Sequence, residues 1–176
     1  MQGRQIGSWW HLARRFLEVG TARRLTEPER KMLSTWLDSA EEASLFYRQA
    51  VADQRHAFRA AQRLHHFAPD RRDLIRAALL HDVGKWHAGL GIVGRSIAGA
   101  LTKLGLPLRG RSAIYVAHGV RGAEELQAIG CEEVVVEFAR HHHDGRPESV
   151  DSEDWSLLEQ ADLPGKPPET NPPAIR

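Results

Sequence analysis

The chain lacks several features that mark particular protein classes. Its one cysteine, Cys131, excludes an internal disulfide and any zinc site that needs two or more thiolate ligands. No segment approaches the roughly 18 consecutive apolar residues of a membrane-spanning helix. The N-terminal segment interrupts its apolar side chains with Arg and His, unlike a signal peptide. We therefore expect a cytoplasmic protein without a membrane partner.

Aromatic residues are also scarce, at 7%. The 41% of apolar and 27% of charged residues are nevertheless typical of globular proteins and exclude wholesale disorder. A length of 176 residues suits one domain with a substantial core. No RNP-like, zinc-finger or helix-turn-helix signature is present, which argues against nucleic acid as a partner.

Neither sign of charge dominates the whole chain, but the two signs are unevenly distributed. Residues 1–111 carry 19 basic and 10 acidic side chains, whereas residues 112–176 carry 5 and 13. This distribution favours ion pairing between the two parts within one fold. A basic surface that collects anionic ligands such as phosphates is the lesser alternative.

Almost every segment has the apolar spacing of a helix, so we predict an all-α fold. Two capping boxes, Thr26–Glu29 and Ser39–Glu42, each open a helix. Ser8 is the predicted cap of an earlier helix, and Asp70 is the predicted cap of the helix that carries DLIRAALLHDVGKW. Further helices are predicted over 53–66, within 87–111, and over 112–129, 131–142 and 151–162.

Two segments qualify this helical pattern. The run Val134–Val136 is a rival strand signal within the predicted helix over 131–142, because β-branched residues favour strands. Residues 164–176 hold five of the nine prolines, so we expect a disordered tail there.

Histidine, in contrast to cysteine, is abundant in this chain. The chain has ten histidines, and all but His11 lie between residues 56 and 143. Potential ligands fall at the ends or inner faces of five predicted helices: His56, His81, Asp82, His118, His142, His143 and Asp162. Imidazole and carboxylate together select first-row transition metals. A ligand set spread over five helices requires a bundle with a metal site in its core.

Most of these positions also have an ordinary interpretation. His118 alone is typical of a hydrogen-bonded helix histidine, the run His141–His143 of a solvated helix end, and Asp162 of a charged helix terminus. The pair His81–Asp82 differs, because it ends the apolar run LIRAALL. An acid beside a buried helix is costly unless a cation neutralises it. The ordered set therefore favours a metal site.

The series His56, His81–Asp82 and Asp162, with LLHDVGK around the pair, closely resembles the HD superfamily of metal-dependent phosphohydrolases in its HDIG-type form. The resemblance covers about residues 50–163 and implies an all-helical bundle of five or more helices. It divides the chain into a helical extension that packs on the core (1–50), an HD domain (51–163) and the tail. The helical segment that leads into DQRH also resembles a bacterial subgroup.

The resemblance also implies which residues hold metal. The minimal family pattern gives one ion four ligands: His56, His81, Asp82 and Asp162. Binuclear members add ligands that match three more positions: His118, His142 and His143. The register of the last run is ambiguous by one residue, and aligning the DG that follows it favours His142 and His143 over His141. The implied cofactor is one or two divalent transition-metal ions (Fe, Mn, Co or Ni), with Asp82 as the bridge.

The expected activity is that of an HD-type metal-dependent phosphohydrolase, in which a metal-activated hydroxide cleaves a phosphoester or phosphoanhydride of a small molecule. HGVRGAEEL and the histidines downstream resemble diadenosine-tetraphosphate hydrolases of the superfamily, which favours a nucleotide. The GYP motif of the cyclic-dinucleotide phosphodiesterases is missing, so cyclic-di-GMP is disfavoured. A linear dinucleotide, a nucleoside mono- or triphosphate and a non-nucleotide phosphoester all fit these motifs.

Four cations are candidates for substrate binding. Lys85 lies about one turn beyond Asp82, and we expect both residues to act in catalysis, with Lys85 as a point charge on a phosphate oxygen. Its alternative interpretation is a solvated lysine. Arg121 follows His118 by one turn, and two more arginines flank His56: Arg55 and Arg59. Ion pairs with the acidic part of the chain are the simpler interpretation of the three arginines.

Two other functions fit the same motifs. Some HD proteins hold a mixed-valent di-iron pair and oxidise a C–H bond with dioxygen, with a ligand set close to this one. A non-catalytic interaction module is the other, with the basic aromatic segment 8–19 as its binding element. No ligand position is lost from the pattern, which favours an enzyme.

Overall fold

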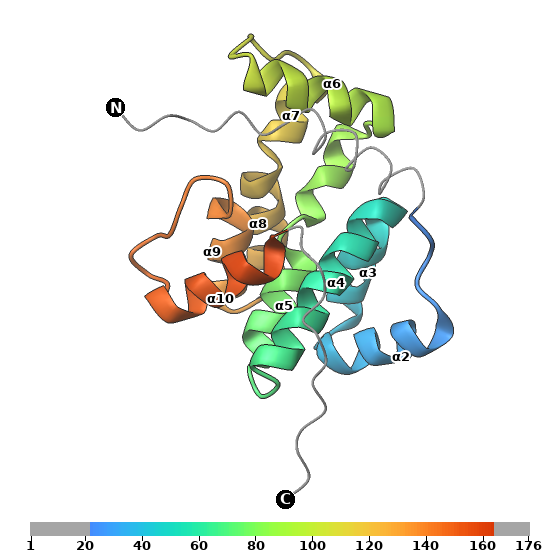
Figure 1. Cartoon of the computed structure of the whole chain (residues 1–176), viewed down its shortest axis with the longest axis vertical. Helices are drawn as coiled ribbons and strands as arrows, with labels where there is room; N and C mark the ends of the chain where they lie inside the picture. The colour runs from blue at the N-terminus through green and yellow to red at the C-terminus, as the bar shows by residue number, and fades with distance from the viewer. Residues whose placement is uncertain (1–21, 164–176) are drawn as a thin grey trace, which may run out of the picture.

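The computed structural model describes residues 22–163, and its regular elements there are all helices, which confirms the predicted all-α fold (Figure 1). In chain order they are α2 (Glu27–Trp36), α3 (Ala40–Arg48), α4 (Val51–Phe67), α5 (Arg72–Leu80), the 3-10 helix η1 (Val83–Ala88), α6 (Ile92–Lys103), α7 (Arg111–Val116), α8 (His118–Ala128), α9 (Glu133–His141) and α10 (Ser152–Asp162). The helix predicted after Ser8 and the tail predicted over 164–176 lie outside the described residues.

Both segments predicted as capping boxes open helices, but at the start of α3 the Glu42 carboxylate accepts from the Asp38 N–H instead of the Ser39 N–H. The backbone N–H of Thr26 donates to the Glu29 carboxylate at 2.7 Å at the start of α2. The Ser39 hydroxyl accepts from the Glu42 N–H at 3.1 Å at the start of α3. These bonds satisfy backbone donors that have no partner inside the helix, so they fix where α2 and α3 begin.

Helix α5 is the centre of the bundle. Every residue from Leu74 to Leu80 is buried, and α5 packs against α4, α9 and α10 and against the two N-terminal helices α2 and α3. The largest fully buried apolar side chains come from all of these layers: Leu33, Phe46, Phe58, Leu64, Leu74, Ile75, Leu79, Leu80, Leu126, Phe138 and Leu158. A helix that is buried on all sides is stable only inside such a bundle, with its one buried charge, Arg76, held in ion pairs.

Helix α5 is shorter than predicted at both ends. Asp70 is not its cap, because the helix begins at Arg72 and Arg71 occupies the N-cap position. Its last residue is Leu80, and Asp82 leaves α-helical geometry with φ −101° and ψ 3° before η1 begins. The chain changes direction there because η1 packs closely against α8. His81 and Asp82 therefore lie at a helix end instead of along a helix face.

The helix predicted over 112–129 is two helices. The chain bends at Ala117, with φ −86° and ψ 18°, so that α7 ends and α8 begins at His118. The helix predicted over 131–142 is confirmed as α9, and the rival strand at Val134–Val136 is wrong. Val135 and Val136 are instead buried on one side of α9, against the core.

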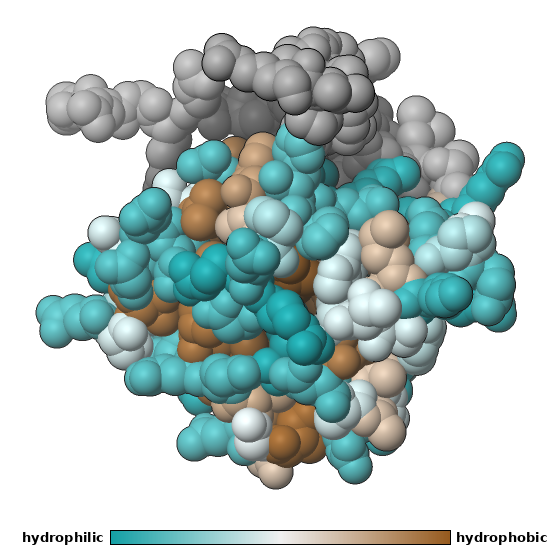
Figure 2. Space-filling view, turned by 90° about the horizontal axis from the view of Figure 1, so that it is seen from below, coloured by the Kyte–Doolittle hydropathy of each residue, from teal (hydrophilic) through white to brown (hydrophobic). Residues whose placement is uncertain are grey.

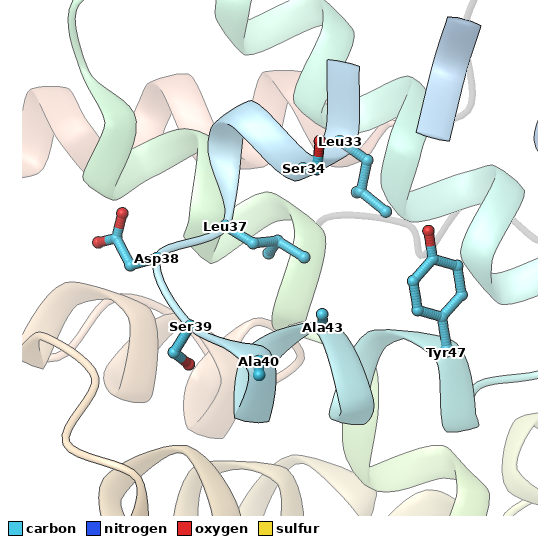
Figure 3. A pocket seen from close by; sticks show the side chains of 8 residues that line it. All are labelled: Leu33, Ser34, Leu37, Asp38, Ser39, Ala40, Ala43 and Tyr47. Carbon is cyan, nitrogen blue, oxygen red and sulfur yellow. The ribbon is translucent and has the colours of Figure 1, made fainter. Parts of the chain in front are cut away.

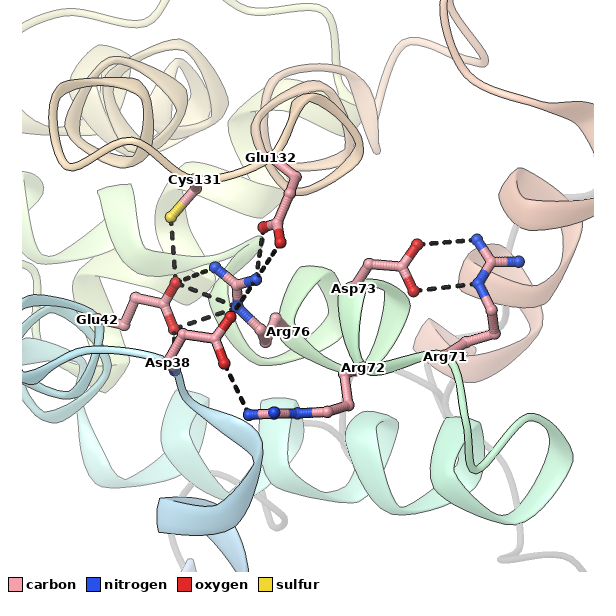
Figure 4. A network of polar contacts seen from close by, with 8 residues as sticks. All are labelled: Asp38, Glu42, Arg71, Arg72, Asp73, Arg76, Cys131 and Glu132. Atoms are coloured by element: carbon pink, nitrogen blue, oxygen red, sulfur yellow. Dashed lines mark hydrogen bonds and ion pairs between the residues drawn. The ribbon is translucent and has the colours of Figure 1, made fainter.

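Ion pairs join the basic first part of the chain to the acidic second part, as the charge distribution predicts. The Arg76 guanidinium is 5% exposed and contacts the carboxylates of Glu42 and Glu132 (Figure 4). Arg71 binds Asp154 of α10 through two bonds of 2.6 and 2.7 Å. The net effect is to tie α5 to α3, α9 and α10 around the bundle core.

The surface seen in Figure 2 is mostly hydrophilic, with small apolar patches between charged side chains. Within residues 22–163, none of the helices combines the length and the apolar character needed to cross a bilayer.

Candidate metal centre

Four ligand candidates form the first donor group, which we define as His56, His81, Asp82 and Asp162: one lies inside α4, two lie at the ends of α5 and α10, and Asp82 lies in the turn after α5. His56 comes from α4, and its Nε2 lies 2.8 Å from Asp162 Oδ1 at the end of α10. His81 Nε2 lies 3.3 Å from the same Asp162 oxygen and 3.4 Å from Asp82 Oδ2. Two imidazoles thus face two carboxylates at hydrogen-bond range.

The second donor group is Asp82, His118, His142 and His143, whose ligand atoms all lie within 4.8 Å of one another. His118 Nε2 is 3.1 Å from Asp82 Oδ1, and His142 Nε2 is 3.5 Å from the same oxygen. Asp82 is therefore shared between the groups, with Oδ2 toward the first and Oδ1 toward the second. Every metal-ligand position expected from the sequence is present in one group or the other.

Backbone carbonyls orient three of the imidazoles. In each, Nδ1 lies at hydrogen-bond distance from a carbonyl of the preceding turn: His81 from Ala78 at 3.0 Å, His118 from Tyr115 at 2.7 Å and His142 from Ala139 at 3.0 Å. A carbonyl only accepts, so each Nδ1 carries a proton. In the neutral form of each ring, the lone pair of Nε2 therefore points into the cluster, which is the arrangement of metal-binding histidines.

The chemistry of these donors fits a bound cation. His118 Nε2 and His142 Nε2 face each other at 3.4 Å, and both are acceptors once Nδ1 holds the proton. They converge on an Asp82 carboxylate that is 2% exposed. Buried acceptors that face one another are unfavourable unless a proton or a metal ion lies between them. Mixed imidazole and carboxylate ligands suit first-row divalent metals.

The electrostatics keep the shared carboxylate ionised. Burial raises the pKa of Asp82, but the Lys85 ammonium and the His81 imidazolium outweigh burial and hold that pKa well below its usual range. Burial lowers the pKa of His81, yet the Asp82 and Asp162 carboxylates raise it to about 10. Asp162 has a lowered pKa, because His81 and His56 outweigh its burial. A divalent ion can replace the positive charge that imidazolium supplies here.

Two glycines allow the elements that carry the ligands to approach closely. A Cβ on Gly84, in the turn after His81 and Asp82, would collide with the His118 carbonyl oxygen and lie 2.6 Å from the backbone nitrogen of Gly122. A Cβ on Gly119 would lie 2.8 Å from the Ala139 carbonyl oxygen. These contacts are shorter than real Cβ atoms make, so only glycine fits.

These close contacts explain how distant segments meet. The Gly84 contact brings Asp82 beside His118, and the Gly119 contact brings α8 against the last turn of α9, which carries His142. Sequence reasoning missed both roles. The signal was present as a glycine beside each expected ligand in HDVGK and HGVRG.

Lys85 is not a solvated lysine. It is 7% exposed, and its ammonium binds Asp82 Oδ2. Burial lowers its pKa, but Asp82 and then Asp53 outweigh burial and raise it, so the ammonium stays charged. Asp53 is itself 9% exposed and precedes His56 on α4 by one turn. No local pattern in the sequence singles Asp53 out.

The three candidate arginines lie in different surroundings. Arg55 donates to a Glu29 carboxylate and to the carbonyls of Arg23 and Arg24, so its guanidinium is directed toward α2. The ion pair of Arg55 therefore joins two residues of the first part of the chain and does not involve the acidic second part. Arg59 and Arg121 are exposed, and no ion pair joins either to a carboxylate of residues 22–163. Of the three candidate arginines, these two leave a guanidinium for an external anion.

The first histidine of the run, His141, lies apart from both donor groups. His141 Nε2 is 3.5 Å from Glu137 Oε2, one turn back on α9. The register that the DG alignment favours therefore agrees with the geometry, in which His142 and His143 join Asp82.

A hollow between α2 and α3 offers no comparable donors (Figure 3). Its lining consists of small, apolar and hydroxyl side chains with one carboxylate: Leu33, Ser34, Leu37, Asp38, Ser39, Ala40, Ala43 and Tyr47. Asp38 pairs with Arg72 and Arg76. The hollow therefore lacks the combination of imidazole and carboxylate ligands that the two donor groups present.

Among the comparisons with known proteins, one identifies a family for this chain. No curated protein and no solved structure gives a significant match. The HD domain family matches residues 54–171, which is more than half of the chain and includes every residue of both donor groups. HD domains are typically metal-dependent phosphohydrolases, and their metal is divalent. The chain belongs to the HD domain family.

Proposed function

We propose that this protein is a binuclear metal-dependent phosphohydrolase that cleaves a phosphoester or phosphoanhydride of a nucleotide. The observation that carries the proposal is the shared carboxylate: Asp82 directs one oxygen to each donor group. A carboxylate shared in this way suits two cations side by side, as in two-metal hydrolytic sites. The HD domain match supports the reaction class.

The ligands divide between two ions in this proposal. His56, His81 and Asp162 would hold the first ion, and three histidines would hold the second: His118, His142 and His143. When bound, the metal ions supply a hydroxide nucleophile near neutral pH and neutralise charge on the phosphate oxygens. The described residues supply the orientation, because backbone carbonyls fix the rings of His81, His118 and His142 before any substrate arrives.

The chain's own cations would orient the phosphate. Lys85 stays protonated beside Asp82 and offers a fixed positive charge inside the site. Arg121 follows His118 by one turn on α8, and Arg59 follows His56 by nearly one turn on α4, so both belong to elements that carry ligands. We assign these two exposed arginines to the outer phosphate or to the rest of the substrate.

The test is phosphate release under anaerobic conditions. The purified protein, loaded separately with Fe, Mn, Co or Ni, is given a panel of linear dinucleotides, nucleoside mono- and triphosphates and simple phosphoesters. We expect phosphate or nucleotide release with at least one metal, and loss of release in Asp82→Asn but not in the exposed control His66→Ala. Consumption of dioxygen with an organic substrate, without hydrolysis, would instead show an oxygenase.

A further inference from the structure

Helix α10 is held by an arginine at each end. Near its start, Arg71 binds the Asp154 carboxylate through two bonds of 2.6 and 2.7 Å. At its end, Arg63 of α4 donates from Nε to the Ala161 carbonyl oxygen at 2.7 Å, and its Nη2 donates to the same oxygen. Only the second contact is next to a candidate ligand, since Asp162 follows Ala161 directly.

The Arg63 contact satisfies a carbonyl of the last helical turn that water cannot reach. The last four carbonyls of a helix have no intrahelical partner, and the Ala161 residue is 0% exposed. Arg63 is itself only 8% exposed. A cation at a helix C-terminus is also favourable for the helix dipole. The side chain therefore fixes the last turn of α10 inside the molecule.

Arg63 also lies on the helix that carries a ligand of the same group. It follows His56 on α4 by seven residues, or two turns, so the two share a face. Its charge interacts with the Asp162 carboxylate. Asp162 Oδ1 in turn lies 2.8 Å from His56 Nε2 and 3.3 Å from His81 Nε2. One arginine thus connects the two helices that bring His56 and Asp162 together.

We propose that Arg63 is a positioning residue for the first donor group, which fixes Asp162 against His56 and His81 by holding the end of α10. The inference rests on the proposed binuclear site. Within residues 22–163, no hydrogen bond joins Arg63 to a ligand of the second donor group or to another residue of α8. Its removal therefore weakens one ion and spares the other.

The experiment compares the two ends of α10 in the full chain, with cobalt(II) alone as the probe. Arg63→Met removes the support at the ligand end, and Arg71→Met is the matched control that removes the pair at the other end. Arg63→Lys is the conservative variant, and Asp162→Ala removes the ligand itself. Calorimetric titration gives the affinity of each ion, the visible cobalt spectrum reports its coordination, and thermal melting of metal-free protein reports stability.

We expect Arg63→Met to weaken one of the two ions by about 10- to 100-fold, the range for residues that support a metal ligand. Arg71→Met should lower the melting temperature while both affinities stay within about 2-fold of the wild type. Arg63→Lys should recover part of the loss and keeps the test decisive if Arg63→Met does not fold. Adding Arg63→Met to Asp162→Ala should cause no further loss of affinity, because Arg63 acts through Asp162.

Three results would overturn the inference. If Arg63→Met and Arg71→Met weaken metal binding equally, or if neither does, Arg63 only stabilises the fold. If Arg63→Met weakens the ion of the second donor group as much as the first, its role is not specific to Asp162. If the wild type binds no cobalt, the proposed function itself fails, and the wild-type titration separates that outcome from the other two.

Discussion

The two donor groups share Asp82 but are built in different ways. The first group has the larger share of oxygen ligands, with two carboxylates and two imidazoles, and its His56 and Asp162 side chains are 33% and 29% exposed. The second group is nitrogen-rich; its His118 and His142 side chains are only 3% and 2% exposed, whereas its His143 is exposed. Side-chain contacts across helices hold the first group, whereas close backbone packing at Gly119 holds the second.

This difference assigns different tasks to the two groups. Oxygen-rich sites suit harder ions, whereas imidazole-rich sites suit the later first-row metals. We therefore expect the two ions to differ in affinity and to respond separately to substitutions in their own surroundings. The ligands that solvent reaches are His56 and Asp162 in the first group and His143 in the second, so a phosphate would approach from the side of these three residues.

The largest effect is expected from a substitution of Asp82, because this residue belongs to both groups. Asp82→Asn keeps the shape of the side chain but removes the charge that both groups share. We expect loss of both ions and a fall in hydrolysis of about 1000-fold or more, because metal ions contribute several kcal/mol of transition-state stabilisation. Elemental analysis and phosphate release measure this. Retention of one ion at wild-type affinity would show that Asp82 is not shared.

A smaller effect is expected from a substitution confined to the second group. Gly119→Ala forces a Cβ to within 2.8 Å of the Ala139 carbonyl, so α8 and α9 must separate. We expect the second ion to bind about 10- to 100-fold more weakly and the free energy of unfolding to fall by about 1–3 kcal/mol. Gly99→Ala in α6 is the matched control, since nothing lies within 4 Å of its Cβ. Equal effects of both variants would refute the packing argument.

Proton release should also distinguish the groups. The pKa of His81 is raised to about 10, so a metal ion that binds the first group at pH 7 must displace about one proton. Burial lowers the pKa of His142, so this ligand of the second group is already neutral at pH 7. Affinity at the first group should then rise about 10-fold per pH unit between pH 7 and 9 and level off above pH 10. Calorimetry in buffers of different ionisation enthalpy counts the protons.

The same pKa shift affects the metal-free protein. Because the folded-state pKa of His81 lies above its ordinary value of 6.5, this group stabilises the fold fully below about pH 6.5, and the contribution is lost as the pH rises through about 10. Metal-free protein that grows more stable over that interval would contradict the charge pairing of His81 with Asp82 and Asp162.

The smallest effect is expected outside both groups. His141 pairs with Glu137, so His141→Ala should change both metal affinities by less than about 2-fold. His142→Ala is the comparison, and it should weaken the second ion by at least about 10-fold. Metal titration of the two variants fixes the register of the histidine run. A reversed order would move the ligand assignment by one residue.

Much of this arrangement could be predicted from the sequence, because the local signals are strong. The capping residues Thr26 and Ser39 fix the starts of α2 and α3, and the order of histidines and aspartates predicts the ligand set. The bends at Asp82 and Ala117 could not be predicted, because tertiary packing of η1 on α8 overrides the helical pattern of those segments.

The roles of the residues that support the ligands could not be predicted from local sequence patterns either. Arg63 resembles any polar residue of α4 until α10 is seen to end beside it, 98 residues later in the chain. Gly119 weakens a helix by its propensity, and only the approach of α9 explains its presence. Contacts between distant segments decide such roles, so no single window of the sequence contains them.

The most direct test of the central claim is anomalous diffraction from crystals grown with cobalt(II), with data collected on both sides of the cobalt absorption edge. The account predicts two anomalous peaks on either side of the Asp82 carboxylate, one among His56, His81 and Asp162 and one among the three remaining ligands: His118, His142 and His143. Cobalt-soaked crystals without a peak beside Asp82, or with ions only at surface histidines such as His66, would contradict it.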